Sequence, residues 1–294
     1  FEMLTVNWAS MRNQGVEIAL STRNVHTKNF MWTTNFNFAY NNNKVLKEAL
    51  REDALEPGRE GYPAGALFAL KTAGLDEEGY PMFEGKDGKA VSAMEFFKLQ
   101  EWGFGAPDLT ARERRELYTY VGTADCPYTG GFNNTFTYKA FELGVNFSFD
   151  FGGKVRSQPT YSIVDFDKGR NTNRDILNRW TPENTETIFP VLLSQNERLD
   201  EYMWYSNQNE IYRNLDIWIR DLNYVRLQNI RLGYTLPTNF SRKLGMTSAT
   251  IAIEGRNLLV FGSSYKNYLD PETMSNAYAT PAPKSVTLSL NLNF

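Results

Sequence analysis

The stretch that decides the fold is Ser285-Val-Thr-Leu-Ser-Leu-Asn-Leu-Asn-Phe294. Apolar and polar side chains alternate through it without exception, which places them on opposite faces of a β-strand. Residues 141–151, Phe-Glu-Leu-Gly-Val-Asn-Phe-Ser-Phe-Asp-Phe, repeat the pattern with an aromatic-rich apolar face. We therefore expect strands here and in the other segments that alternate in the same way, which are 14–23, 30–40, 132–138, 224–236 and 249–261.

The connections between these seven predicted strands alternate strictly between short and long. The short ones are 24–29, 139–140 and 237–248, and the long ones are 41–131, 153–223 and 262–283. Loops of this length are uncommon in soluble domains, whereas transmembrane β-barrels combine short periplasmic turns with long extracellular loops. The pattern predicts an all-β fold, a transmembrane antiparallel β-barrel with long extracellular loops.

Aromatic residues gather near the ends of the predicted strands, as the interfacial girdles of such barrels require. Phe30, Trp32 and Tyr138 lie beside short turns, and Tyr40, Phe149, Phe151 and Phe261 lie beside long loops. The positions of these aromatic residues favour the barrel over a soluble β-sandwich, whose strands alternate in the same way.

Two local patterns add detail. The alternation in 224–236 slips by one residue near Gln228-Asn229, which predicts a β-bulge because an odd insertion moves every later side chain to the opposite face. Thr110-x-x-Glu113 resembles a capping box, so we expect a short helix that runs as far as Tyr118.

Composition excludes several classes of function. The chain has 294 residues and a net charge of −3, with no basic block, so we expect no nucleic-acid partner. One cysteine, Cys126, and one histidine, His26, cannot form a zinc cluster or an internal disulfide, and we predict neither metal nor cofactor. The longest apolar run, about six residues at 188–193, is far short of the roughly 20 that a membrane-spanning helix needs.

The first four residues, Phe-Glu-Met-Leu, carry no export signal. Either the chain stays in the cytoplasm, or the N-terminus of the protein lies upstream of Phe1. An odd number of strands cannot close a bacterial single-chain barrel. We therefore expect residues 1–294 to be the C-terminal portion of a larger barrel domain.

We expect no catalytic residue and no enzymatic activity. The acid pairs Glu113/Glu116 and Glu183/Glu186 resemble the two carboxylates of a glycosidase, but acids at this spacing usually form a solvated face. Asp270-Pro-Glu272 is interpreted as a turn in which proline fixes φ.

Three groups of residues are candidates for other roles. Aromatic residues in the long loops could contact substrate or pack against a partner protein: Tyr202, Trp204, Tyr205, Trp180 and Trp102. Polar residues in the middle of a strand are expected to line the lumen, where they bind a plug domain or passing solute: Glu142, Asn146 and Asp150. The last strand ends on an aromatic residue and is expected to act as the barrel-assembly signal through Leu290, Leu292 and Phe294.

Several short motifs, in the correct order, resemble one family. They are Asn13-Gln-Gly-Val-Glu17, Asn41–Lys44, Gly122-Thr123, Gly130-Gly-Phe132, Tyr224–Pro237, Gly255-Arg-Asn-Leu-Leu259, Asp270-Pro-Glu272 and the final Phe294. Together they are similar to the closing barrel strands of the SusC/RagA family of TonB-dependent outer-membrane transporters.

The resemblance implies location, mechanism and partners. It implies an outer-membrane barrel of about 22 strands, a size class of plugged transporters, whose plug and first strands are not in this sequence. It also implies import of oligosaccharides or peptides, a SusD-like lipoprotein over the extracellular loops, and TonB acting on the missing N-terminal part. A dimer of transporter–lipoprotein pairs is left open. The alternatives are a passive or structural outer-membrane barrel and a soluble β-rich carbohydrate-active enzyme.

Overall fold

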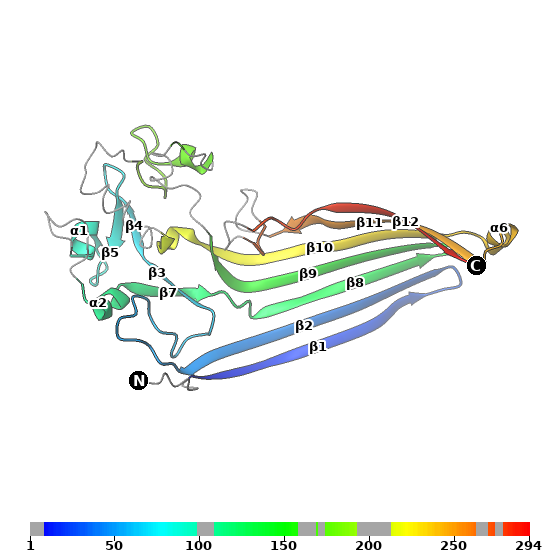
Figure 1. Cartoon of the computed structure of the whole chain (residues 1–294), viewed down its shortest axis with the longest axis horizontal. Coiled ribbons are helices and arrows are strands. Elements are labelled where there is room, and N and C mark those ends of the chain that lie inside the picture. The colour runs from blue at the N-terminus through cyan, green and yellow to red at the C-terminus, as the bar shows by residue number, and fades with distance from the viewer. Residues whose placement is uncertain are drawn as a thin grey trace, which may run out of the picture. The chain divides into compact units, whose positions relative to one another are not determined.

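A computed structural model of the chain (Figure 1) describes residues 9–98, 109–157, 169, 174–192, 213–262, 270–273 and 279–294. The chain divides into two compact units. The loop unit consists of Phe1–Met11, Lys44–Thr123 and Val155–Arg220. The sheet unit consists of Arg12–Asn43, Ala124–Lys154 and Asp221–Phe294. No helix in the described ranges is long and apolar enough to cross a membrane.

All seven predicted strands are present, and they form a single antiparallel sheet in which each strand lies beside the next in chain order (Figure 1). Their bounds are β1 (Ser10–His26), β2 (Phe30–Lys47), β8 (Tyr128–Tyr138), β9 (Phe141–Arg156), β10 (Ile219–Thr235), β11 (Ser248–Phe261) and β12 (Ser285–Asn293). Most extend beyond the alternating segments; His26, for example, belongs to β1 rather than to the first turn. Backbone pairing continues where the side-chain alternation fades, so the sequence underestimates strand length.

The predicted β-bulge is confirmed at the expected place. Leu227 pairs with Leu259, but Asn229 pairs with Arg256, so one residue of β10 lies opposite two of β11. The extra residue of β11 is Asn257, with φ of 53°. Asparagine tolerates this left-handed conformation better than most residues do. Its side-chain amide donates a hydrogen bond to the Pro283 carbonyl at 3.3 Å, so the Gly-Arg-Asn motif fixes both the bulge and the return of the chain into β12.

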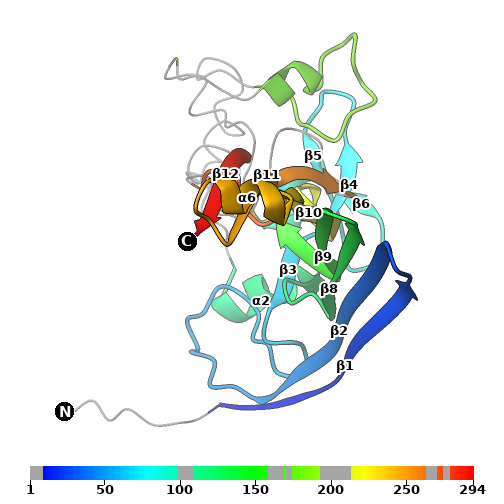
Figure 2. The ribbon, with the colours of Figure 1, turned by 90° about the vertical axis from the view of Figure 1, so that its right-hand side faces the viewer.

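The short connections are residues 27–29, 139–140 and 236–247. The third contains the short helix α6 (Thr238–Lys243). These connections and the end of the chain at Phe294 lie at one end of the sheet (Figures 1 and 2). The long connections leave from the other end, as the alternation of link lengths predicts.

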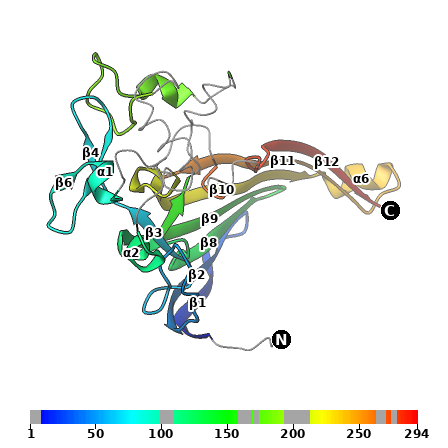
Figure 3. The same ribbon diagram turned by 60° about the vertical axis from the view of Figure 1, so that its left-hand side comes forward.

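The loop unit has a folded structure of its own (Figure 3). A pair of strands, β3 (Ala66–Leu70) and β7 (Tyr118–Thr123), is accompanied by a three-stranded sheet of β4 (Thr72–Leu75), β5 (Pro81–Glu84) and β6 (Ala90–Val91). Its helical turns are α1 (Ala93–Phe96), α2 (Ala111–Glu116), η1 (Arg174–Asn178) and η2 (Asp216–Trp218). A core of buried side chains joins the first two long connections: Leu70, Phe83, Phe97, Leu215 and Trp218.

The strands of the loop unit were not predicted, because segments of two to six residues show too few alternations to be recognised. The capping box is confirmed: the Thr110 hydroxyl accepts from the Glu113 amide, and the Glu113 carboxylate accepts from the Thr110 amide. The helix that it opens ends at Glu116, so the expected extension to Tyr118 is wrong. Tyr118 is instead the first residue of β7 and pairs with Leu70.

Candidate functional site

The residues predicted to line a lumen lie together on the polar face of the sheet. The register between β8 and β9 places Glu142 opposite Thr137, and Asp150 opposite Thr129. The same face continues onto β10, where the Gln228 amide donates to the Ser148 hydroxyl at 2.7 Å. Asn146 belongs to a row of amides that crosses three strands, which the register forms from Asn35, Asn133 and Asn146.

The opposite face is apolar and remains exposed. On β12, Leu288 is 76% and Leu290 is 62% exposed, and Phe294 at the chain end is 83% exposed. Further exposed aliphatic residues are Val16, Ile18, Leu20, Leu232, Ile251, Ile253, Leu259, Val286 and Leu292. Soluble monomers rarely expose a continuous apolar surface of this extent, so the face requires an apolar environment.

Aromatic residues border this apolar face at both ends of the strands. The register aligns Phe30, Tyr138 and Phe141 beside the short connections, and Tyr40, Tyr128 and Phe151 beside the long ones. From Phe30 to Tyr40 the strand rises about 34 Å at roughly 3.4 Å per residue. At a strand tilt of about 40°, this corresponds to about 26 Å along the membrane normal, close to the roughly 25 Å apolar band of outer-membrane barrels.

A buried cluster of charged groups occupies the polar face near the middle of β10. Arg226 is only 2% exposed, and its guanidinium is paired with Asp270 and, through Nε at 2.9 Å, with Glu272. The neighbouring Tyr224 hydroxyl donates to Asp150 Oδ2 at 2.6 Å. The cluster therefore connects the predicted lumen residue Asp150 to the long connection between β11 and β12.

Backbone amides complete the binding of Asp270. Its carboxylate accepts hydrogen bonds from the amides of Glu272 at 3.0 Å and of Ala282 at 3.3 Å. Burial alone would raise the pKa of Asp270, but the hydrogen bond from Arg226 and those from the two amides hold this pKa below its ordinary value. The interpretation of 270–272 as a turn agrees with the structure, but the sequence analysis missed its ion pair with Arg226. The signal was an arginine on a strand with apolar neighbours, which needs an acidic partner if it is buried.

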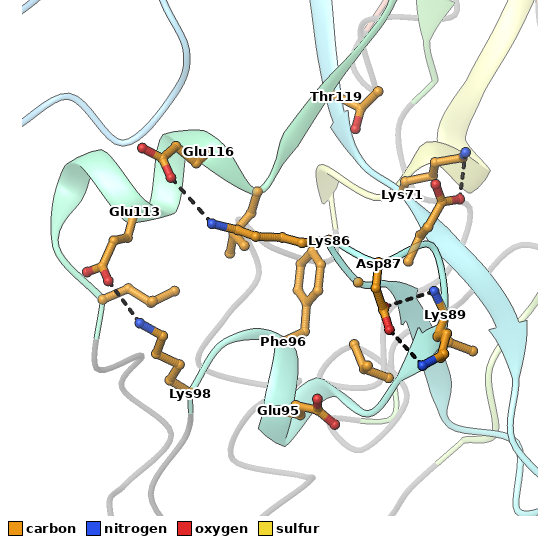
Figure 4. A pocket seen from close by; sticks show the side chains of 16 residues that line it. Lys71, Lys86, Asp87, Lys89, Glu95, Phe96, Lys98, Glu113, Glu116 and Thr119 are labelled. Atoms are coloured by element: carbon orange, nitrogen blue, oxygen red, sulfur yellow. Dashed lines mark hydrogen bonds and ion pairs between the residues drawn. The ribbon is translucent and has the colours of Figure 1, made fainter.

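The loop unit contains a cavity of about 780 Å³ whose rim carries paired charges (Figure 4). The ion pairs around it are Lys71–Glu84, Lys86–Glu116, Lys89–Asp87 and Lys98–Glu113. Glu113 accepts from Lys98 at 2.8 Å and from the Thr110 amide and hydroxyl, and these bonds lower its pKa to about 2. Glu113 and Glu116 are thus held by cations and a helix cap, which agrees with a structural role for this pair.

The other predicted site residues fall into two groups. Trp102, Tyr202, Trp204 and Tyr205 lie outside the described residues. Trp180 is half-buried and packs so closely over Gly79 that a β-carbon on this glycine would lie 2.5 Å from the Trp180 ring. In the parts of the chain that the structure describes, no three His, Cys, Asp or Glu side chains are arranged to hold a metal ion.

Comparison with known proteins gives a consistent result. No protein-family model matches the chain. It is 27% identical to TonB-dependent receptor P3 of Formosa agariphila and 22% identical to TonB-dependent receptor SusC of Bacteroides thetaiotaomicron, over 98% and 99% of its length. It covers only 29% and 27% of those two proteins.

Solved structures agree on the fold. The chain matches the RagAB peptide transporter with a TM-score of 0.70 and 22% identity, covering 98% of this chain and 30% of that one. A second structure, the RagAB peptide importer in its closed-closed state, gives a TM-score of 0.69 at the same identity. These relatives are receptors and transporters rather than enzymes. In sequence and fold, the chain is similar over nearly its whole length to the C-terminal part of TonB-dependent receptors that include SusC, as its motifs indicate.

Proposed function

We propose that this chain forms the C-terminal portion of the β-barrel, with its extracellular loops, of a TonB-dependent outer-membrane transporter that imports oligosaccharides or peptides. The observation that carries the proposal is the two-faced sheet. One face is a row of amides and charged groups, and the other is an exposed apolar surface between two aromatic rows. This use of both faces is typical of a wall between water and lipid.

The rest of the barrel completes this wall. In the described sheet, β1 and β12 each have one neighbouring strand, and open strand edges are not tolerated at membrane depth. Further strands of the same transporter therefore pair with both edges. With Phe294 at the periplasmic rim, the three short connections are periplasmic and the long ones extracellular. Glu142, Asn146 and Asp150 then face the lumen, where they bind the plug by hydrogen bonds.

The loop unit supplies the extracellular surface. Its buried core around Phe83 and Trp218 makes it a preformed platform rather than a set of flexible loops. A SusD-like lipoprotein would dock on this surface, and TonB would act on the plug from the periplasm. The RagAB structures, described as those of a peptide transporter and importer, share the fold of this chain, which supports an import function.

Uptake by the native host tests the proposal. We expect deletion of the full transporter gene to abolish growth on one class of oligosaccharide or peptide, and inactivation of TonB to have the same effect. Uptake that survives the loss of TonB would favour a passive channel. A chain found in the soluble fraction with hydrolytic activity would refute the membrane assignment.

Partner and substrate need separate measurements. An affinity tag on the intact transporter should retain a SusD-like lipoprotein through mild detergent extraction, and its absence from the purified complex would contradict the assigned partner. Replacing Trp204 and Tyr205 with alanine should weaken substrate binding without lowering the amount of transporter in the outer membrane. Unchanged affinity would show that these loop aromatics only pack against protein.

A further inference from the structure

The end of the sheet that carries the short connections is uniformly basic. Residues 27–29 contain Lys28, residues 139–140 contain Lys139, and residues 236–247 contain Arg242 and Lys243, whereas these three connections contain no aspartate or glutamate. All four cationic side chains are exposed. Among the described residues, none of the four forms an ion pair, although the Lys139 ammonium lies 5.3 Å from the centre of the Tyr138 ring. The chain as a whole has a net charge of −3, so this end has the opposite sign.

Helix α6 adds apolar side chains to the same end. The helix ends at a glycine in the left-handed conformation, Gly245, with φ of 76°. The Met246 amide donates to the Ser241 carbonyl, and the Gly245 amide donates to the Arg242 carbonyl. This is a Schellman motif, which sets the direction of the helix firmly. Ser241 is fully buried and Met246 is 8% exposed, so these two residues attach α6 to the sheet unit.

The apolar residues of α6 do not take part in this attachment. Phe240 and Leu244 are 51% and 57% exposed, and at a spacing of four residues they form one stripe. Arg242, about 200° around the helix from Phe240, lies on roughly the opposite side. The turn is therefore amphipathic, and its apolar stripe faces away from the protein.

Helix α6 lies at the end of the sheet where the exposed apolar face ends in an aromatic row (Figure 1). The strand that leads into α6 carries Tyr234, which packs against Phe141 at 4.6 Å between ring centres in the aromatic row beside the short connections. Tyr234 is aligned with Ile251 and Leu290, two exposed aliphatic residues of the same face. Phe294 lies at this end too, close to α6 (Figure 2).

We propose that the short-connection end of the sheet is a binding surface for anionic phospholipid headgroups. Phe240 and Leu244 enter the boundary between headgroups and acyl chains, and Lys28, Lys139, Arg242 and Lys243 bind lipid phosphates. Exposed aromatic and aliphatic residues beside lysine and arginine are the composition of interfacial helices. The inference rests on the proposed function, because it takes the adjoining apolar face to be in the membrane.

A lipid occupant fits this end better than a protein occupant. The cations are spread over alternate gaps between strands, so they form a row along the rim of the wall rather than one compact patch. Turns two strands apart are separated by roughly 10 Å, given about 4.8 Å between neighbouring strands. A leaflet that surrounds the rim can bind every member of such a row at the same time.

Lipid binding by the intact, detergent-purified transporter tests the proposal. The variant Lys28→Gln/Lys139→Gln/Arg242→Gln/Lys243→Gln removes the row, and its binding of phosphatidylglycerol and phosphatidylcholine is measured by titration and native mass spectrometry. Each cation at an anionic surface contributes about fivefold in affinity. We expect phosphatidylglycerol affinity to fall at least tenfold, and phosphatidylcholine affinity to change little.

Two further variants make the test specific. A matched control removes four exposed cations of the loop unit, Arg51, Lys86, Lys89 and Arg112, by the same change to glutamine, and should bind phosphatidylglycerol like the wild type. The variant Phe240→Ser/Leu244→Ser should bind both lipids more weakly, because it removes the inserted side chains.

The lipid proposal and the proposed function fail in different ways. Equal phosphatidylglycerol affinity in the row variant and the wild type would overturn the lipid proposal even where uptake is TonB-dependent. Unchanged lipid affinity together with lost uptake would overturn it in favour of a periplasmic protein partner. Failure of the wild-type transporter to insert or to support TonB-dependent uptake would instead refute the proposed function.

Discussion

Replacement of Arg226 with methionine should release the connection between β11 and β12 from the polar face. The Arg226 and Asp270 side chains are 2% and 6% exposed, so the variant leaves a buried carboxylate without its cation. Breaking one side of a buried pair costs about 3–5 kcal/mol. Because Asp270 keeps its bonds to the Glu272 and Ala282 amides, and Glu272 is 44% exposed, we expect about 3 kcal/mol, the lower end of this range.

Hydrogen exchange of the intact transporter measures this change directly. The amides of Glu272 and Ala282 are protected by the Asp270 carboxylate. A loss of about 3 kcal/mol raises the local opening constant by roughly a hundredfold, and exchange of peptides containing these amides should accelerate by that factor. Amides around the Leu232–Ile253 pair of β10 and β11, which lies six residues along β10 from Arg226, should exchange at the wild-type rate, because strand pairing there does not depend on the cluster.

Arg231→Met is the matched control, since Arg231 lies on the same strand and pairs with Glu142 at 3.3 Å. Both side chains are well exposed, at 37% and 53%, so less than about 1 kcal/mol should be lost. The loss of stability in Arg226→Lys should lie between the losses in the two methionine variants, because lysine keeps the charge but lacks the planar guanidinium that binds two carboxylates. Unchanged exchange in Arg226→Met, or equal effects of both methionine variants, would refute the anchoring role of this cluster.

Three further predictions concern other parts of the chain. Trp218→Ala removes a fully buried side chain and should destabilise the loop unit by about 3–5 kcal/mol. A protease should then cleave the long connections while the sheet stays intact. Resistance to the protease equal to that of the wild type would contradict a common core. The pKa of Glu113 is lowered in the folded protein, so its contribution to helix α2 should be complete above pH 4.5 and lost as the pH falls towards about 2. Amide hydrogen exchange in α2, corrected for the pH dependence of intrinsic rates, should accelerate over this pH range in the wild type but not in Glu113→Gln. An acceleration that persists in this variant would show that another group titrates. Asn257→Ala places alanine at φ of 53° and removes the hydrogen bond to the Pro283 carbonyl, so the free energy of unfolding should fall by about 1–2 kcal/mol. Thermal melting of the intact transporter measures this loss, and an unchanged melting temperature would exclude strain at the bulge.

Much of the sheet could be predicted because its signal is local and repeated. Seven alternating segments predicted seven strands, and one slip in phase at Gln228 predicted the bulge. The five small strands of the loop unit escaped prediction because a segment such as Ala90–Val91 is too short to show a period. The helix after Thr110 was predicted at its start, where the capping box is a local pattern, but not at its end, which pairing of Tyr118 with Leu70 determines.

The same distinction applies to the candidate site. Alternation placed Glu142 and Asp150 on the polar face, since a strand turns successive side chains to opposite sides whatever surrounds it. Sequence could not show that Arg226 pairs with Asp270, because 44 residues separate them and nothing local brings them together.

The sequence by itself determined the strands, their two faces, the alternation of short and long connections, and the family that the motifs resemble. These depend on a period of two and on short motifs, which neighbouring residues set. Only the tertiary structure decided that two of the three long connections share one core around Trp218, and that Asp270 is bound to the wall by Arg226. These depend on contacts between distant residues, and chain folding alone brings such residues together.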